Sequence, residues 1–259
     1  MPAPRAIAPL TLARPDGHVL AYDRLDGAGP AVVFLHGLNS DRGGTKALAL
    51  EAHCRAAQRS FVRFDMFGHG QSSGAFTDGG PTRWADDAVA VIDRLTQGPV
   101  VLAGSSMGGW IMLLAARARP ERVAGLLGIA AAPDFTEDLM WAQFTPGQRA
   151  ALAAQGFVDL PSDYADGPYR IGRHLIEDGR KNLVLRGSIA LSCPVRLMHG
   201  QSDQSVPWQT ALTLAGRLVS AQVETVLIKD GDHRLSRPAD LKRLCNVLDD
   251  LLAAVGAVS

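Results

Sequence analysis

Cysteine is scarce in this 259-residue chain, which contains only Cys54, Cys193 and Cys245. An odd, scattered set lacks the close pairs that zinc sites and disulfide scaffolds need, so we expect buried, reduced thiols. The histidines are dispersed as well, and neither an HExxH pattern nor a calcium-binding loop occurs. The glycine-rich stretch 65–73 lacks the Lys-Ser/Thr ending of a P-loop. We therefore expect neither a metal nor an organic cofactor.

An excess of charge of one sign is also lacking, because Lys and Arg total 26, as do Asp and Glu. Without a net positive field the chain has no general attraction for nucleic acid, which we exclude as a partner. No apolar run reaches the roughly 18 residues of a membrane span. Residues 1–9 contain three prolines and no apolar segment of secretory length. These absences predict a cytoplasmic protein without a membrane span.

Hydrophobic residues make up 47% of the chain, enough for a large core in one domain. Short β-branched apolar runs alternate with amphipathic stretches, which is typical of parallel strands joined by helices. We predict an α/β fold, with a mostly parallel central sheet and helices on both faces. The expected strands are 19–25, 31–36, 60–64, 100–104, 123–129, 195–199 and 223–228, with one more near 10–14. The expected helices are 45–57, 82–97, 106–119, 208–218 and 238–255.

The segment 134–192 interrupts this alternation. It has helical patterns but no clear strand, and it holds several aromatic residues: Trp141, Phe144, Phe157, Tyr164 and Tyr169. Because so long a stretch needs structure of its own, we predict a cap inserted into a core formed by 1–133 and 193–259. We refer to 134–192 as the cap segment. The alternative is that it simply packs against the sheet.

Ser106 is the predicted nucleophile. The run 100–103 reads as a strand that enters Gly104-Ser105-Ser106-Met107-Gly108, and a helix follows. Such a turn presents its central serine at the carboxyl edge of the sheet, and it needs glycines where side chains would collide with neighbouring backbone. Ser105 lies one step before the apex and is disfavoured.

Asp203 and His233 are the predicted partners of this serine. A serine hydroxyl needs a base to take its proton, and the base needs a carboxylate to orient it. Asp203 follows one late strand and His233 follows the last one, so the chain order is serine, acid, histidine. Asp230 and Asp232 lie too close to His233 in sequence to reach its far ring nitrogen.

Two backbone N–H groups should hold the negative oxygen that forms during such a reaction. One is expected from Met107, the residue after the nucleophile, and the other from Leu38, in the loop after an early strand. Gly37 would allow that loop to approach closely.

These motifs together resemble the α/β-hydrolase family over nearly the whole chain. They are the His-Gly loop at 36–37, the Asp-x-x-Gly-x-Gly-x-Ser turn at 65–72, the serine turn, His-Gly-x-x-Asp-x-x-Val-Pro at 199–207 and the late histidine. More narrowly, 40–50, 63–65, 104–110 and 206–208 resemble the palmitoyl-protein thioesterases of that family. The resemblance implies removal of S-acyl groups from protein cysteines and hydrolysis of acyl glucuronides, with Ser106, Asp203 and His233 at the matching catalytic positions.

The expected substrate is thus a small acyl ester or thioester, or an acylated protein. Carboxylesterases and carbon–carbon bond hydrolases can use the same triad, and a non-enzymatic binding scaffold is a third alternative. Candidate substrate contacts are Trp141 and Phe144 for an acyl group, and Arg42, with Lys46, for an anionic group. Ordinary core packing and solvated surface charge are the simpler interpretations of these residues.

Overall fold

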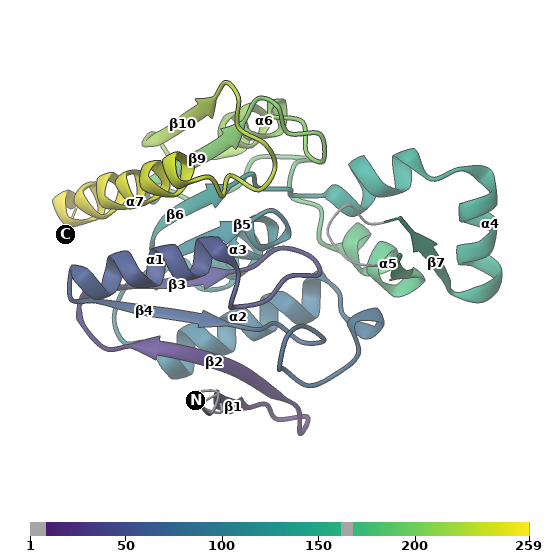
Figure 1. The fold of residues 1–259 in the computed structure, drawn as a ribbon, viewed down its shortest axis with the longest axis horizontal. Helices are drawn as coiled ribbons and strands as arrows, with labels where there is room; N and C mark the ends of the chain where they lie inside the picture. Colours follow the sequence, from purple (N-terminus) through teal and green to yellow (C-terminus); the bar gives the residue numbers. More distant parts are fainter. Residues whose placement is uncertain (1–8, 162–167, 259) are drawn as a thin grey trace, which may run out of the picture.

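The computed structural model describes residues 9–161 and 168–258, and its centre is an eight-stranded sheet (Figure 1). Its strands are β1 (Leu10–Ala13), β2 (Val19–Leu25), β3 (Ala28–Leu35), β4 (Arg59–Phe64), β5 (Val100–Ser105), β6 (Val123–Ile129), β9 (Val195–Gly200) and β10 (Val223–Ile228). They are ordered β1-β2-β4-β3-β5-β6-β9-β10. The β1–β2 and β2–β4 pairs are antiparallel, and the other neighbours are parallel.

Helices cover both faces of this sheet. They are α1 (Thr45–Ala56), α2 (Pro81–Leu95), α3 (Met107–Ala118), α6 (Gln209–Arg217) and α7 (Pro238–Val258), with a short turn η1 (Phe76–Asp78). One buried apolar cluster contains Trp84 of α2 and Trp110 of α3, and a second contains Leu50 of α1 and Leu248 of α7. Alternate residues of β3 and β5 belong to different clusters, so the clusters lie on opposite faces.

The predicted fold class is confirmed, and each expected strand and helix of the core is present within a few residues of its predicted bounds. The strands could be predicted because parallel strands are covered on both faces and therefore carry nearly continuous apolar runs. Strand β5 is the clearest case, since all of its residues are buried. Within the described part of the chain, no helix is both long and apolar enough to cross a membrane.

The cap segment lies to one side of the core (Figure 1). It contains η2 (Thr136–Trp141), α4 (Pro146–Gln155), β7 (Phe157–Leu160), β8 (Tyr169–Gly172) and α5 (Arg173–Lys181). The sequence shows no clear strand in this segment, but the structure contains an antiparallel hairpin of β7 and β8. Strand β7 begins with two adjacent apolar residues, Phe157 and Val158, so it lacks the strict alternation that marks a half-buried strand. Tyr164 lies outside the described residues.

Asp134 joins the beginning of the cap segment to its end. Its Oδ1 accepts the N–H of Val184 at 2.8 Å, and its Oδ2 accepts the N–H of Leu185 at 2.9 Å. Burial raises the pKa of Asp134, although these two N–H groups oppose the shift. The contacts hold the cap segment's entry and exit next to each other on the core.

Gly108 lies where α3 passes closest to β3. A Cβ at this position would lie 2.2 Å from the carbonyl oxygen of Leu35 and 2.6 Å from that of His36. Because backbone cannot move aside cheaply, Gly108→Ala is expected to lower the free energy of unfolding by about 1–3 kcal/mol. Urea denaturation measures the change.

Gly216 provides the matched control for this prediction. It is exposed on α6, and an added Cβ would meet nothing within 4 Å. Gly216→Ala should therefore raise the free energy of unfolding by about 0.5–1 kcal/mol, the gain expected for alanine over glycine in a helix. A Gly108→Ala variant as stable as the Gly216→Ala variant would contradict the argument from close backbone approach.

Candidate active site

Ser106 occupies the sharp turn between β5 and α3. Its φ of 53° and ψ of −119° are strained for a residue with a side chain. Backbone bonds hold the turn, because Ser106 N–H donates to Ile129 O at 2.9 Å and Ala132 N–H donates to Ser106 O at 3.0 Å. A Cβ on Gly104 would lie 2.3 Å from Gly108 O, so this turn also requires glycine there. The hydroxyl of Ser106 is thereby presented at the carboxyl edge of the sheet.

His233 connects Ser106 to Asp203 by hydrogen bonds. Its Nε2 lies 3.1 Å from Ser106 Oγ, and its Nδ1 lies 2.7 Å from Asp203 Oδ2. In the neutral ring that suits this arrangement, Nδ1–H donates to the carboxylate and Nε2 accepts from the serine hydroxyl. The structure thus brings together the three residues that follow β5, β9 and β10.

Asp203 is buried and accepts four hydrogen bonds. Its Oδ1 accepts the N–H groups of Ser205 and Val206, each at 2.8 Å. Its Oδ2 lies 2.7 Å from His233 Nδ1 and 3.2 Å from His199 Nε2. Burial alone would raise the pKa of Asp203, but the bonds from His199, His233 and Val206 hold it well below its ordinary value. The carboxylate is therefore ionised at neutral pH and able to stabilise a charged His233.

The two expected oxyanion donors lie next to the serine. Leu38 and Met107 both line the cavity that contains Ser106 and His233. Gly37 brings the first loop close, since a Cβ there would lie 3.4 Å from Ser106 Cβ. That separation is ordinary van der Waals contact, so the loop lies directly against the serine turn while leaving room for a Cβ.

His36 orients the loop that carries Leu38. Its Nε2 accepts the Met66 N–H at 3.1 Å, so Nδ1 carries the ring proton and donates to Gly37 O at 2.8 Å. Burial lowers the pKa of His36 to about 4, which keeps the ring neutral. Because N–H and C=O point in opposite directions across a trans peptide, the Leu38 N–H points away from His36.

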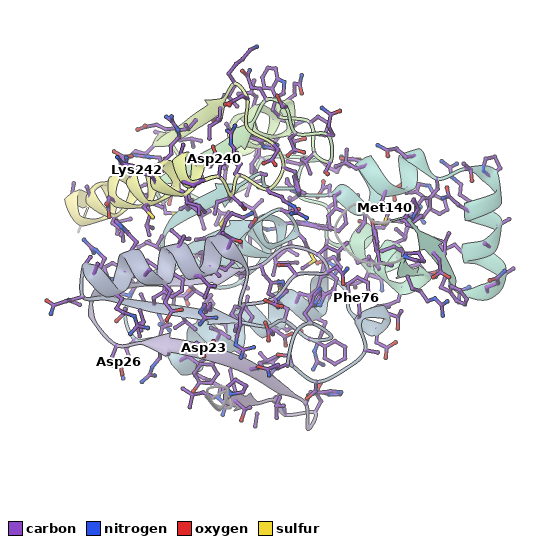
Figure 2. All side chains as sticks on the ribbon, in the orientation of Figure 1. Asp23, Asp26, Phe76, Met140, Asp240 and Lys242 are labelled. Carbon is purple, nitrogen blue, oxygen red and sulfur yellow. The ribbon has the colours of Figure 1, made fainter. Side chains whose placement is uncertain are left out.

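A cavity of about 760 Å³ opens at Ser106 and His233. Met140, labelled in Figure 2, lies where the cap segment meets the core. Besides two glutamines, Gln143 and Gln148, the cap segment contributes mostly apolar side chains: Phe135, Leu139, Met140, Phe144, Leu160 and Tyr169. The rest of the lining includes polar side chains: Asn39, Lys46, Gln204, Ser205, Arg234 and Ser236. The site can therefore hold an apolar group and a polar group at once.

Of the four candidate substrate contacts, Phe144 and Lys46 line this cavity, whereas Trp141 and Arg42 are not part of its described lining. The Trp141 ring instead contacts the guanidinium groups of Arg149 and Arg180, at 4.9 and 4.5 Å from its centroid. These cation–π contacts account for the aromatic side chain without a substrate.

Arg42 also lies outside the lining of this cavity, and its contact with substrate stays a prediction. Its guanidinium donates to Asp23 Oδ2 at 2.8 Å and also to Asp65 and Gln71. Asp23 is labelled on β2 in Figure 2, far from Met140. Two carboxylates already balance the charge of Arg42, so it is committed to the fold.

The structure gives specific contacts to Lys46, which the sequence paired with Arg42, and to His199, which was not among the predicted site residues. Lys46 lines the cavity, and its Nζ donates to the carbonyl oxygen of Arg234 at 2.6 Å. Burial lowers the pKa of Lys46 to about 8. His199 contacts the Asp203 carboxylate, which its place four residues before Asp203 at the end of β9 could have indicated. Among the described residues, no group of three or more side chains is arranged to bind a metal.

Two relatives and one more distant structure define what the chain resembles. Mitochondrial palmitoyl-protein thioesterase ABHD10 of Homo sapiens is 38% identical over 248 residues, which cover 95% of this chain and 81% of that protein. The structure of mouse ABHD10 has a TM-score of 0.88 at 38% identity, covering 95% of this chain and 99% of that one. Est1E of Butyrivibrio proteoclasticus, solved with ferulic acid, has a TM-score of 0.79 at 20% identity, covering 95% and 99%. The last likeness shows the fold alone.

The names of these relatives contradict the predicted cytoplasmic location. ABHD10 of Bos taurus, Pongo abelii, Homo sapiens, Mus musculus and Rattus norvegicus is named as mitochondrial in every case. The prediction was wrong. It inferred a compartment from the absence of a secretory segment and of a membrane span. Such an absence does not determine where a protein resides.

The family comparison covers most of the core. Residues 32–244 match the alpha/beta hydrolase family. This range runs from β3 into α7 and includes Ser106, Asp203 and His233. With the 38% identity to human ABHD10 over 95% of the chain, the match shows that this chain belongs to the alpha/beta hydrolase family.

Proposed function

We propose that the chain is a serine hydrolase that cleaves acyl thioesters or esters through an acyl-enzyme formed on Ser106. The observation that carries this proposal is the hydrogen-bonded series from Ser106 Oγ through His233 to Asp203, placed at the cavity. Serine, histidine and a carboxylate in this order suffice for acyl transfer without a metal or an organic cofactor.

Acylation begins at the serine hydroxyl. His233 Nε2 takes the proton from Ser106 Oγ as that oxygen attacks the acyl carbon. The negative charge that develops on the carbonyl oxygen is stabilised by the N–H groups of Leu38 and Met107. The carbon–sulfur or carbon–oxygen bond then breaks, and His233 gives its proton to the departing thiol or alcohol. Asp203 stays ionised and stabilises the imidazolium while it exists.

Deacylation repeats these steps with water as the nucleophile. His233 removes a proton from water, the hydroxide attacks the acyl carbon, and the same two N–H groups hold the oxyanion. Ser106 leaves as the carbon–oxygen bond breaks, takes back the proton from His233 and is restored.

A thioester substrate with an apolar acyl group is the version that we favour. The cap segment supplies mostly apolar side chains, so we propose that it acts as a cap over the acyl group. Relatives at 38% identity are named palmitoyl-protein thioesterases, which supports an S-acylated cysteine as the substrate group. The polar part of the lining suits the more polar leaving group.

A substrate panel tests this version. The panel contains S-acyl thioesters and p-nitrophenyl esters of graded and matched chain length, with Ser106→Ala as the blank. Turnover of the thioesters, with an optimum at one chain length, is expected. Turnover of the p-nitrophenyl esters alone would indicate a general carboxylesterase. If the wild type hydrolyses neither series, the proposed hydrolase is rejected.

Lys46 supports a second substrate class, in which the leaving group is anionic, as in an acyl glucuronide. The ammonium lines the same cavity as Ser106 and already faces an oxygen acceptor, the carbonyl of Arg234. The quantity to measure is the ratio of kcat/KM for an acyl glucuronide to kcat/KM for the neutral methyl ester of the same acid. Lys46→Met is expected to lower this ratio by about 5- to 10-fold, the effect of losing a partly exposed ion pair. With a pKa of about 8, Lys46 loses its charge above that pH, and the wild-type ratio should decline there.

Lys242→Met is the control for this measurement. Lys242 is exposed on α7, where Figure 2 labels it. Its replacement by methionine should therefore leave the ratio unchanged. If Lys46→Met weakens hydrolysis of both substrates equally, Lys46 acts by holding the Arg234 carbonyl and not by meeting an anion.

A further inference from the structure

His199 lies against the carboxylate of the proposed triad, on the side away from solvent. It is fully buried near the end of β9. Its Nε2 lies 3.2 Å from Asp203 Oδ2 and 3.1 Å from the carbonyl oxygen of Val206. His199 and His233 therefore meet the same carboxylate oxygen.

The surroundings of His199 determine which of its ring nitrogens carries the proton. Both neighbours of Nε2 are acceptors, so Nε2 must be the donor. Its Nδ1 is buried and has no hydrogen-bond partner among the described residues. The ring is consequently held as the Nε2–H tautomer, with its single polar hydrogen directed at Asp203 and Val206.

We propose that His199 is a positioning residue for the reaction, acting through Asp203; this inference rests on the proposed function. The Ser205 and Val206 N–H groups hold Oδ1. The His199 N–H holds Oδ2, so that this oxygen faces His233 before the reaction begins. The same hydrogen bond takes up part of the negative charge on Oδ2 and so limits how strongly the carboxylate favours a protonated His233.

Charged groups other than the two histidines also lie near Asp203. Lys46 of α1 interacts electrostatically with Asp203, Asp232 and Arg234, and Arg234 follows His233 in the same loop. Among the described residues, none of these charged groups donates a hydrogen bond to Asp203 Oδ2. That oxygen is buried, and its hydrogen bonds come from His199 and His233. Removing His199 therefore leaves Oδ2 with more negative charge and less restraint.

The test compares His199→Phe, which keeps a flat ring but has no donor, with His199→Gln, which keeps a donor at about the position of Nε2. His199→Phe is expected to lower kcat about 10-fold, the effect of a lost hydrogen bond to a charged group. KM should change little, and the acidic limb of the pH profile of kcat/KM should move to higher pH, because the less neutralised carboxylate favours the imidazolium. His199→Gln should recover most of kcat and of the profile.

Packing alone predicts the opposite order, since phenylalanine suits a buried apolar space better than glutamine does. A His199→Phe variant as active as the wild type, or more active than His199→Gln, would therefore overturn the inference. Nitrogen NMR of the unmodified protein gives a test that does not depend on any variant folding. The resonances should show His199 with a protonated Nε2 and a bare Nδ1, and the opposite tautomer would also overturn it.

Labelling with a fluorophosphonate separates this inference from the proposed function. If the wild type is not labelled at Ser106, the triad assignment fails and the role of His199 fails with it. If the wild type is labelled and active while His199→Phe shows the wild-type kcat and pH profile, only the role of His199 is rejected.

Discussion

Replacing Ser106 by alanine is expected to lower kcat by about 10⁴- to 10⁶-fold and to leave substrate affinity nearly unchanged. The substitution removes the only atom that bonds to the acyl carbon, while Leu38 and Met107 keep their N–H groups and the cavity keeps its shape. The strained φ of 53° is already present with a side chain, so alanine adds no new backbone conflict. Steady-state kinetics on an acyl thioester measures the loss, and intact-mass analysis after fluorophosphonate treatment should show an adduct on the wild type alone.

Ser105→Ala is the matched control for this variant. Ser105 is the neighbouring serine and the last residue of β5, buried in the sheet. The Ser105→Ala variant should be labelled and active like the wild type. Labelling of Ser106→Ala, or loss of labelling in Ser105→Ala alone, would assign the nucleophile to the other position.

Asp203→Asn is expected to lower kcat by about 10⁴-fold while the fold is retained. The reason lies in the four bonds that the carboxylate accepts. Two backbone N–H groups point at Oδ1, so the amide nitrogen of asparagine must take the place of Oδ2. It would then present N–H groups to His233 Nδ1 and favour the ring tautomer whose Nε2 carries the proton. Such a ring cannot accept the proton of Ser106.

Asp230→Asn is the control, because Asp230 is exposed and pairs with Arg237. It should retain the wild-type rate, and a large loss there would move the role of the acid away from Asp203.

The stability of the fold provides a second measurement on Asp203. The pKa of Asp203 is held below its unfolded value, so its charge stabilises the protein above about pH 4 and this contribution is lost as the pH falls further. The difference in unfolding free energy between wild type and Asp203→Asn should therefore shrink in acid.

The regular part of the fold could be predicted because it depends on patterns a few residues long. Strand β5 is apolar throughout since helices cover both faces of a parallel sheet. The hairpin of β7 and β8 could not be predicted in the same way. Its first strand, β7, has the adjacent apolar residues Phe157 and Val158 and so shows no strict alternation.

The candidate site, too, could be predicted only in part. Ser106, Asp203 and His233 could be named in advance because each follows a strand, and the carboxyl ends of parallel strands meet at one edge of the sheet. The direction in which a side chain points could not be predicted from the sequence. Arg42 and Lys46 are four residues apart, yet Arg42 turns to Asp23 and Asp65 while Lys46 reaches the cavity.

By itself, the sequence determined the α/β sheet, the glycine-dependent turn at Ser106 and the chain order of the three residues proposed as a triad, because these follow from local patterns, steric limits and chain order. Only the tertiary structure decided that Lys46 lines the cavity while Arg42 does not, and that His199 meets the same carboxylate oxygen as His233. Those outcomes depend on which hydrogen-bond acceptor lies within reach of each polar side chain. The distances between such groups are set by packing between segments that are far apart in the chain.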